Sequence, residues 1–218
     1  MSCPCPRRAC LTTLVLATVA SLLCGCSSTI SGHEFMHRVD QPSMQAPPGK
    51  ALVIFHRPEK LVAGGLTFTV WDEEQFVGLT LGGQGLAYAC DAGQHTFVGR
   101  CEMSGHWGAI PFGEYTTAID ATLEAGRVYD VYCEAHWKLV VHTVKLRPVT
   151  QSEEKLRRKV PGWIEDAKWQ AMRPESPERL AAFEAQERAT VQEALAAAAA
   201  EADLPRLSPE DGRPVERR

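Results

Sequence analysis

The sequence lacks an apolar run of the roughly 20 residues that a transmembrane helix needs. The N-terminal apolar segment, residues 11–23, has only 13 residues, and it follows the positive pair Arg7-Arg8. A short positive region followed by an apolar segment of this length is typical of a secretory signal peptide. We therefore expect an exported protein, whose signal peptide comprises residues 1–25.

The end of this segment predicts a lipid anchor. It reads Leu23-Cys24-Gly25-Cys26, and the small Gly25 directly before Cys26 resembles the bacterial lipobox, whose cysteine receives a diacylglyceryl group. Cys24 is a poorer acceptor because it follows a leucine. Each buried methylene contributes about 0.8 kcal/mol, so two or three acyl chains hold a protein in a membrane almost permanently. An uncleaved anchor and an ordinary secretory signal are the alternatives.

The residue after the predicted lipid site indicates the membrane. Ser27 stands there, and no aspartate suggests retention at the inner membrane. We therefore expect the outer membrane of the cell envelope, with the protein facing the periplasm. Without the signal, 21 basic residues stand against 27 acidic ones, a net charge of −6. No basic patch is evident, which argues against nucleic acid as a partner.

Cysteine is scarce once the signal peptide is removed. Three of the eight cysteines remain besides Cys26, an odd number for an oxidising compartment. A predicted hairpin around residues 91–94 places Cys90 roughly 20 Å from Cys101, whereas a disulfide needs Cα atoms within about 7 Å. A disulfide, if one forms, therefore includes Cys133, and Cys101 is its candidate partner.

Composition changes along the mature chain predict four further regions. Residues 26–49 are polar and rich in proline, which indicates a lipidated tether able to reach about 75–83 Å from the anchor when extended. Residues 50–148 hold short apolar or alternating runs separated by turns. A helical extension is expected over 149–204 and a disordered tail over 205–218.

The middle region predicts about eight short strands. Residues 115–123 alternate between apolar and polar side chains, as expected for a strand with one buried face. Residues 72–75 and 91–94 are typical of hairpin connections. We therefore expect a mainly β fold, an antiparallel β-sandwich with a C-terminal helical extension. The expected strands are 51–56, 66–71, 76–81, 85–90, 95–100, 115–123, 128–133 and 137–146.

The extension predicts one long helix. Ser176-Pro177-Glu178 is a strong start signal, because it combines a cap residue, a first-position proline and an acid at the positive dipole end. The helix is expected to run to residue 202. Its apolar stripe is thin and interrupted by Glu187, which predicts a helix that the sandwich does not need. A shorter helical segment is expected to carry Trp163, Ile164 and Trp169.

Residues 47–147 resemble an uncharacterised bacterial lipoprotein family, the domain of unknown function numbered twenty-eight forty-six, and also sandwich modules of the PEGA type. The shared features are turn glycines and strand starts, so the resemblance implies a sandwich fold and no reaction. Where that family often has paired tyrosines, this chain has Tyr129-Asp130. The matching segments are Pro48-Gly49-Lys50-Ala51, Arg57-Pro58, Asp72 with Gly78, Ala92-Gly93-Gln94-His95 and Ala125-Gly126-Arg127-Val128-Tyr129.

One enzymatic motif is present. His33-Glu34-Phe35-Met36-His37 fits HExxH, in which two histidines one helical turn apart bind zinc and the glutamate activates water. The motif begins seven residues after Cys26, inside the predicted tether, and a segment this short is marginal as an isolated helix. A zinc-dependent hydrolase is therefore kept only as the alternative function, and no metal or other cofactor is expected.

Other catalytic signals are missing. The sequence has neither a Gly-x-Ser-x-Gly elbow nor a Cys-x-x-Cys metal spacing. His106-Trp107 lies in a glycine-rich loop, where Trp107 is either a buried aromatic or a contact for an envelope protein partner. We therefore expect a non-enzymatic, membrane-anchored lipoprotein with a binding or structural sandwich domain.

Overall fold

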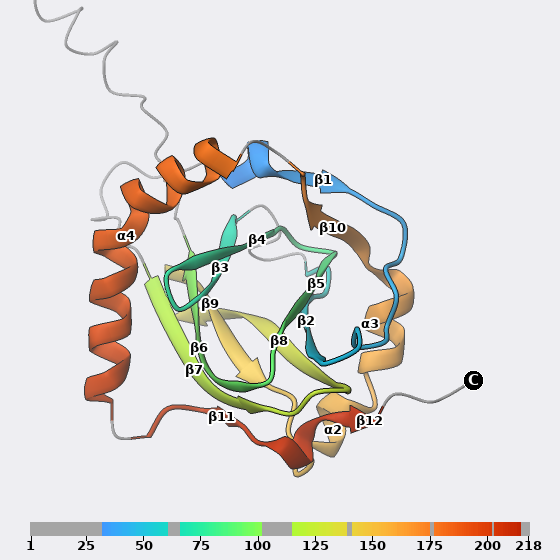
Figure 1. Ribbon diagram of the computed structural model, residues 1–218. Coiled ribbons are helices and arrows are strands. Elements are labelled where there is room, and N and C mark those ends of the chain that lie inside the picture. Colours follow the sequence, from blue (N-terminus) through green and yellow to red (C-terminus); the bar gives the residue numbers. More distant parts are fainter. Residues whose placement is uncertain are drawn as a thin grey trace, which may run out of the picture. The chain divides into compact units, whose positions relative to one another are not determined.

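Two β-sheets pack face to face in the computed structural model, which describes residues 32–60, 66–101, 115–138, 141–174, 177–201 and 203–214 (Figure 1). The expected signal peptide, the predicted lipid site Cys26 and the predicted contact Trp107 lie outside these residues. None of the helices described here is long and apolar enough to cross a membrane.

The first sheet, called sheet A, is built around a central strand that is almost entirely apolar. In β2 (Lys50–Arg57), every residue after Lys50 is buried, because both faces of this strand are covered. The neighbours of β2 are β5 (Gln84–Asp91), which runs antiparallel to it, and β8 (Arg127–Lys138), which runs parallel. The remaining strands of sheet A are β1 (Met36–Arg38), β10 (Lys168–Met172), β12 (Arg213–Pro214) and β9 (Val141–Pro148).

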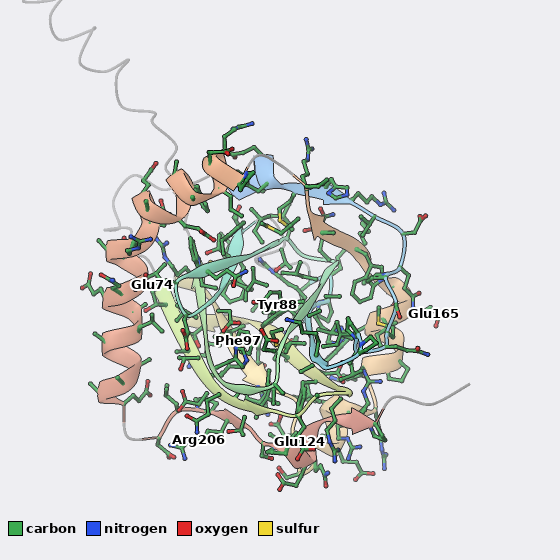
Figure 2. The ribbon with its side chains drawn as sticks, in the orientation of Figure 1. Glu74, Tyr88, Phe97, Glu124, Glu165 and Arg206 are labelled. Carbon is green, nitrogen blue, oxygen red and sulfur yellow. The ribbon has the colours of Figure 1, made fainter. Side chains whose placement is uncertain are left out.

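The second sheet, sheet B, has the strand order β11-β7-β6-β3-β4. Strand β7 shows the predicted alternation, since Ile119, Ala121 and Leu123 are buried while Thr122 and Glu124 are exposed. Tyr88 of β5 and Phe97 of β6 point into the space between the sheets (Figure 2), and their ring centroids lie 6.4 Å apart. The bounds are β11 (Arg206–Leu207), β7 (Tyr115–Leu123), β6 (Gly93–Cys101), β3 (Phe68–Asp72) and β4 (Gln75–Thr80).

The mainly β sandwich with its C-terminal helix is confirmed, and strands occur in all eight predicted places. Both sheets are mixed, however, because β2–β8, β10–β5 and β11–β7 are parallel pairs. The hairpin at 72–75 is confirmed by the pairing of Asp72 with Gln75. The predicted hairpin at 91–94 is not formed, because β5 belongs to sheet A and β6 to sheet B. This turn therefore connects the two sheets.

The long helix α4 (Pro177–Ala200) forms where it was predicted, but it is part of the core. It covers the outer face of sheet B, where Val191 is fully buried and Phe183 stacks on Trp71 at 5.8 Å. Glu187, which interrupts the apolar stripe, is itself buried and receives a 2.8 Å hydrogen bond from Arg100 of β6. The prediction of a helix that the sandwich does not need is therefore wrong.

The predicted tether belongs to the fold from Gly32 onward. A 3-10 helix, η1 (Gly32–Phe35), leads into β1, which pairs antiparallel with β10. Phe35 and Met36 are buried in the core cluster. The predicted shorter helical segment is right for Trp163 and Ile164, which lie in α3 (Val160–Asp166). It is wrong for Trp169, which lies in strand β10 and packs against Gly85.

The predicted disordered tail is ordered as far as residue 214. Leu207 of β11 is buried against sheet B, and η2 (Pro209–Asp211) turns the chain toward β12, which pairs with β8. Ser208 and Asp211 cap this turn through reciprocal hydrogen bonds, and Arg127 donates a 3.0 Å hydrogen bond to the carbonyl of Gly212. The segment 205–214 thus adds one short strand to each sheet, β11 beside β7 and β12 beside β8 (Figure 1).

Candidate binding site

Three polar side chains, His56, Asp130 and Arg213, meet on the outer face of sheet A because of strand register. Asp130 of β8 lies directly opposite Ile54 of β2, so His56, two residues further along β2, is its diagonal neighbour on the same face. On the other side of β8, Arg213 of β12 pairs with Val128 and is therefore also diagonal to Asp130. Residues far apart in the sequence are thus placed in one row across three strands.

The row is a continuous chain of short polar contacts. His56 Nε2 lies 2.8 Å from Asp130 Oδ1, and the guanidinium of Arg213 binds the same carboxylate through Nε at 2.8 Å and Nη2 at 3.1 Å. His56 and Asp130 are buried, with exposed fractions of 1% and 5%. Polar groups this well shielded from water are found where they are hydrogen-bonded, as His56 and Asp130 are to each other.

The environment of Asp130 fixes its ionisation. Burial alone would raise the pKa of this carboxyl, but the hydrogen bonds and charges of His56 and Arg213 outweigh burial and hold the pKa below its usual value. An ionised carboxylate only accepts hydrogen bonds, so Nε2 of His56 must carry the proton that it shares with Asp130. Nδ1 of His56 is the other ring nitrogen, and it has no hydrogen-bond partner among the described residues.

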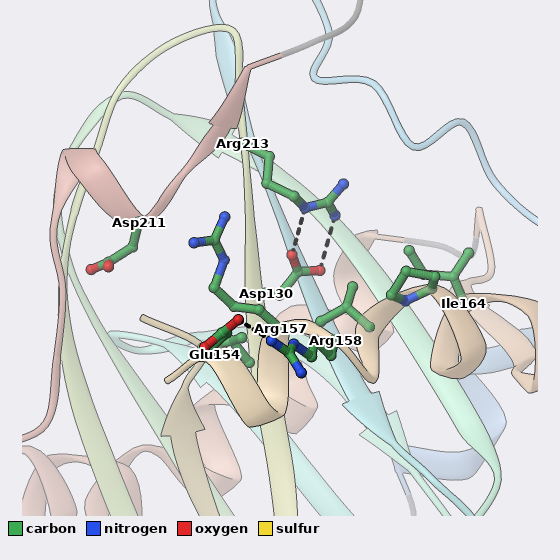
Figure 3. A pocket seen from close by; sticks show the side chains of 10 residues that line it. Asp130, Glu154, Arg157, Arg158, Ile164, Asp211 and Arg213 are labelled. Atoms are coloured by element: carbon green, nitrogen blue, oxygen red, sulfur yellow. Dashed lines mark hydrogen bonds and ion pairs between the residues drawn. The ribbon is translucent and has the colours of Figure 1, made fainter. Parts of the chain in front are cut away.

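A cavity of about 600 Å³ lies on the Asp130 side of this row, between α2 (Glu154–Arg157), α3 and the C-terminal segment (Figure 3). We call it the Arg157 cavity. Figure 3 shows Arg157 projecting from α2 between Asp211 and the Asp130–Arg213 pair. Arg158 is paired with Glu154, whereas Arg157 has no ion-pair partner in the described part of the chain. The opposite wall of this cavity is apolar and contains Val149, Val160 and Ile164.

A second cavity, of about 470 Å³, lies on the His56 side, and we call it the His56 cavity. The Trp163 ring lies against His56, with ring centroids 5.6 Å apart, and both side chains line this cavity. Besides His56, its polar lining comes from Arg57, Glu59, Gln84 and Asp166. Glu59 and Asp166 are exposed at the rim, and neither has an ion-pair partner among the residues that the structure describes.

Two of the candidate residues from the sequence are buried cysteines. Cys90, Cys101 and Cys133 form no disulfide, so the candidate disulfide between Cys101 and Cys133 is not present. Burial raises the pKa of Cys133 to about 12, and burial together with Asp72 and Asp91 raises that of Cys90 to about 12. These two thiols are therefore protonated at neutral pH and poor nucleophiles.

The HExxH match does not have the geometry that the motif requires. Residues 32–35 form a 3-10 helix and residues 36–38 a strand, so His33 and His37 are not one α-helical turn apart on a common face. His33 Nε2 lies 3.2 Å from Thr67 Oγ1, whereas His37 is in β1, opposite Ala171 of β10. Within the described residues, no group of three or more potential ligands is arranged to hold a metal ion.

No family model matches this sequence, and neither does any curated protein or solved structure. The resemblance to the uncharacterised lipoprotein family therefore stays a prediction. Sequence reasoning did not identify Asp130 as a residue of the site. A carboxylate in the middle of the apolar strand Val128–Val131 was the available signal, since such a group needs a buried partner.

Proposed function

We propose that this protein is a lipid-anchored lipoprotein of the bacterial envelope, whose sandwich domain faces the periplasm and binds another envelope component without catalysis. The apolar segment 11–23 followed by Gly25-Cys26 supports the anchor. Ser27 favours the outer membrane as its location.

The binding role is carried by one observation, the buried His56–Asp130–Arg213 row with a cavity on each side. Shielded charges beside a cavity are a common feature of functional sites, and ligand cavities combine apolar walls with a few oriented polar groups. Among the described residues, neither cavity is lined by a serine, threonine or cysteine that His56 can activate. A buried histidine–aspartate pair without such a nucleophile favours binding over acyl transfer.

The anchor is tested by replacing its acceptor. Intact mass of the membrane-extracted protein should give a chain that begins at Cys26 and carries acyl groups. Cys26→Ser should abolish the acylation, because serine offers no thiol for the diacylglyceryl transfer. Cys24→Ser is the matched control and should leave the mass of the mature protein unchanged. An unmodified chain that begins at another residue would overturn the proposal.

A further inference from the structure

We infer that His95 is a proton-dependent link between the two sheets, with both of its ring nitrogens protonated in the folded protein at neutral pH. Asp72 of β3 pairs with Phe97 of β6, so His95, two residues before Phe97, is the diagonal neighbour of Asp72 on the same face of sheet B. His95 Nδ1 lies 2.9 Å from both carboxylate oxygens of Asp72. His95 Nε2 lies 3.0 Å from the carbonyl oxygen of Asp91, at the end of β5 in sheet A. One ring thus joins the two sheets next to the turn that connects them.

The charge of His95 follows from its two partners. A backbone carbonyl oxygen and an ionised carboxylate only accept hydrogen bonds, whereas a neutral imidazole has one N–H and one lone pair. A neutral ring would therefore point a lone pair at one of the two oxygens. A proton on the Asp72 carboxyl would remove this conflict, but imidazole is a stronger base than a carboxylate by about 2–3 pH units, so the shared proton resides on the ring. Only an imidazolium donates to both partners.

Two aromatic side chains complete the surroundings of this pair. The hydroxyl of Tyr88 donates a 3.0 Å hydrogen bond to Asp72 Oδ2, and burial together with the charge of Asp72 raises the pKa of Tyr88, so the hydroxyl stays a donor. The Phe97 ring stacks on His95 with ring centroids 5.8 Å apart, and an aromatic face at this distance stabilises a cation. The side chains of His95 and Asp72 are exposed by 14% and 8%, so salt and water screen their interaction weakly.

The other titratable groups around His95 ordinarily keep their charge in the range in which an imidazole titrates, between pH 5 and 8. The carboxylate of Asp91 forms a 2.8 Å ion pair with Lys50 of β2, and the hydrogen bond and charge of Lys50 hold the pKa of Asp91 below its usual value. The remaining ones are the protonated Cys90 of β5, and Asp120 of β7 and Arg206 of β11, which line a cavity of about 320 Å³ beside His95.

Loss of one proton breaks the link on one side. The neutral ring keeps a single N–H, so either Asp72 or the carbonyl of Asp91 loses its donor. Contacts that favour the protonated form stabilise the fold at acidic pH, and their contribution declines as the pH rises. We therefore expect the connection between the sheets to weaken as the pH rises from 5 to 8.

Nitrogen NMR of the histidine rings tests the charge directly, because protonated and unprotonated ring nitrogens give separate signals. The protein is the full mature chain carrying Cys26→Ser, so that lipid does not hold it in a membrane. The signals of His95 are assigned by their disappearance in His95→Gln. Both ring nitrogens of His95 should be protonated at pH 7. One unprotonated ring nitrogen at this pH would overturn the inference.

Two substitutions separate the contact with Asp72 from a general effect of negative charge. Asp72→Asn removes the carboxylate that favours the second proton, so His95 should then have one unprotonated ring nitrogen at pH 7. Asp120→Asn is the matched control, because it removes the same charge from a carboxylate whose Oδ1 accepts a hydrogen bond from Thr96. It should leave both ring nitrogens of His95 protonated. The same response in both variants would contradict a specific link.

Urea unfolding at pH 5 and pH 8 measures what the link contributes to the fold. Relative to His95→Gln, the folded-to-unfolded ratio of the wild type should fall about three- to tenfold between these pH values, the difference between a hydrogen bond to a charged group and one between neutral groups. His56 is present in both proteins, so its own titration cancels. His33→Gln removes an exposed histidine and should parallel the wild type. Parallel profiles of the wild type and His95→Gln would overturn the inference.

Discussion

One continuous helix covers the outer face of sheet B, whereas sheet A is covered by short segments that come from distant parts of the sequence. Over sheet B, α4 supplies 24 consecutive residues, and its Glu187 forms a buried ion pair with Arg100. Sheet A is covered by four separate segments, namely residues 39–46, α2, α3 and the C-terminal segment. The two cavities of the candidate site lie next to these short segments. The buried His56–Asp130 pair and Arg213 lie between the two cavities.

The ion pairs on the outer faces of the two sheets differ in their exposure to water. Arg100 and Glu187 face each other between a helix and a sheet, with exposed side-chain fractions of 2% and 6%. Arg213 is exposed by 39% and keeps Asp130 at the wall of a cavity. We therefore expect the covering of sheet B to dominate stability and the covering of sheet A to dominate binding.

Removing the C-terminal coverings of both sheets should have the largest effect. A chain that ends at Pro148 loses α4 as well as α2, α3 and the C-terminal segment, and it exposes the outer face of sheet B and the part of sheet A that residues 39–46 do not cover. We expect the cooperative thermal transition, measured by circular dichroism, to disappear because so much apolar surface is no longer buried. A truncated chain that melts as sharply as the complete one would restore the hypothesis of an independent helix.

Breaking the ion pair under α4 should have the next largest effect. Glu187→Ala removes the carboxylate that the buried guanidinium of Arg100 contacts at 2.8 Å, and loss of one partner of a buried pair costs about 3–5 kcal/mol. Urea unfolding measures this loss in the free energy of unfolding. Glu193→Ala, on an exposed position of the same helix, should change it by no more than about 0.5 kcal/mol. Equal losses in the two variants would show that α4 does not depend on the pair.

Replacing the carboxylate of Asp130 on the outer face of sheet A should lower the free energy of unfolding by less than Glu187→Ala does. Asp130→Asn removes the charge that Arg213 and His56 contact, and hydrogen bonds to charged groups contribute about 1.5–3 kcal/mol. Arg213 remains partly in water and is less penalised than Arg100. Urea unfolding of this variant beside Glu187→Ala tests the ranking directly. A larger loss of unfolding free energy in Asp130→Asn than in Glu187→Ala would show that the covering of sheet A contributes more to stability.

The same substitution changes the acid sensitivity of the protein. The pKa of Asp130 is lower in the folded state than in the unfolded one, so its ionisation stabilises the fold above the unfolded value of about 3.9. This contribution is lost as the pH falls through the folded-state pKa. Between pH 5 and the acid limit, the free energy of unfolding should therefore fall more steeply for the wild type than for Asp130→Asn. Parallel pH profiles would contradict the assignment.

The smallest effect is expected at Arg157. Its guanidinium lies in a cavity without an ion-pair partner among the described residues, so Arg157→Gln should leave the free energy of unfolding within about 0.5 kcal/mol of the wild type. Thermal melts of the two proteins are sufficient to measure this. A loss comparable to that of Glu187→Ala would make Arg157 a structural residue and remove the distinction between the two covers.

The strands could be predicted because each carries a local signal. Residues 115–123 alternate between apolar and polar side chains, with Ile119, Ala121 and Leu123 buried on one face, and residues 51–55 form an apolar run between turns. The pairing of these strands has no such signal. Parallel β2 and β8 lie more than 70 residues apart, and the turn at 91–94 has the same composition whether it closes a hairpin or joins two sheets.

The candidate site and the segments that build it were missed for related reasons. Strands β11 and β12 have two residues each, too few to show any period, and their polar neighbours made 205–214 look disordered. Glu187 was interpreted as a break in an apolar stripe, because the buried Arg100 that pairs with it is 87 residues away. His56 and Asp130 each stand in an apolar strand, where a lone polar residue indicates an unknown partner but does not identify it.

The position of η1 has a consequence for where the protein works. Five residues separate Cys26 from Gly32, where the fold begins, so a lipid on Cys26 would hold the first residue of the fold within about 20–22 Å of the anchor. A ligand or partner confined to the same membrane surface would share a very small volume with the sandwich. If Cys26 carries lipid, the effective concentration of such a ligand would be on the order of millimolar, so that a site too weak to bind it from dilute solution would still be occupied.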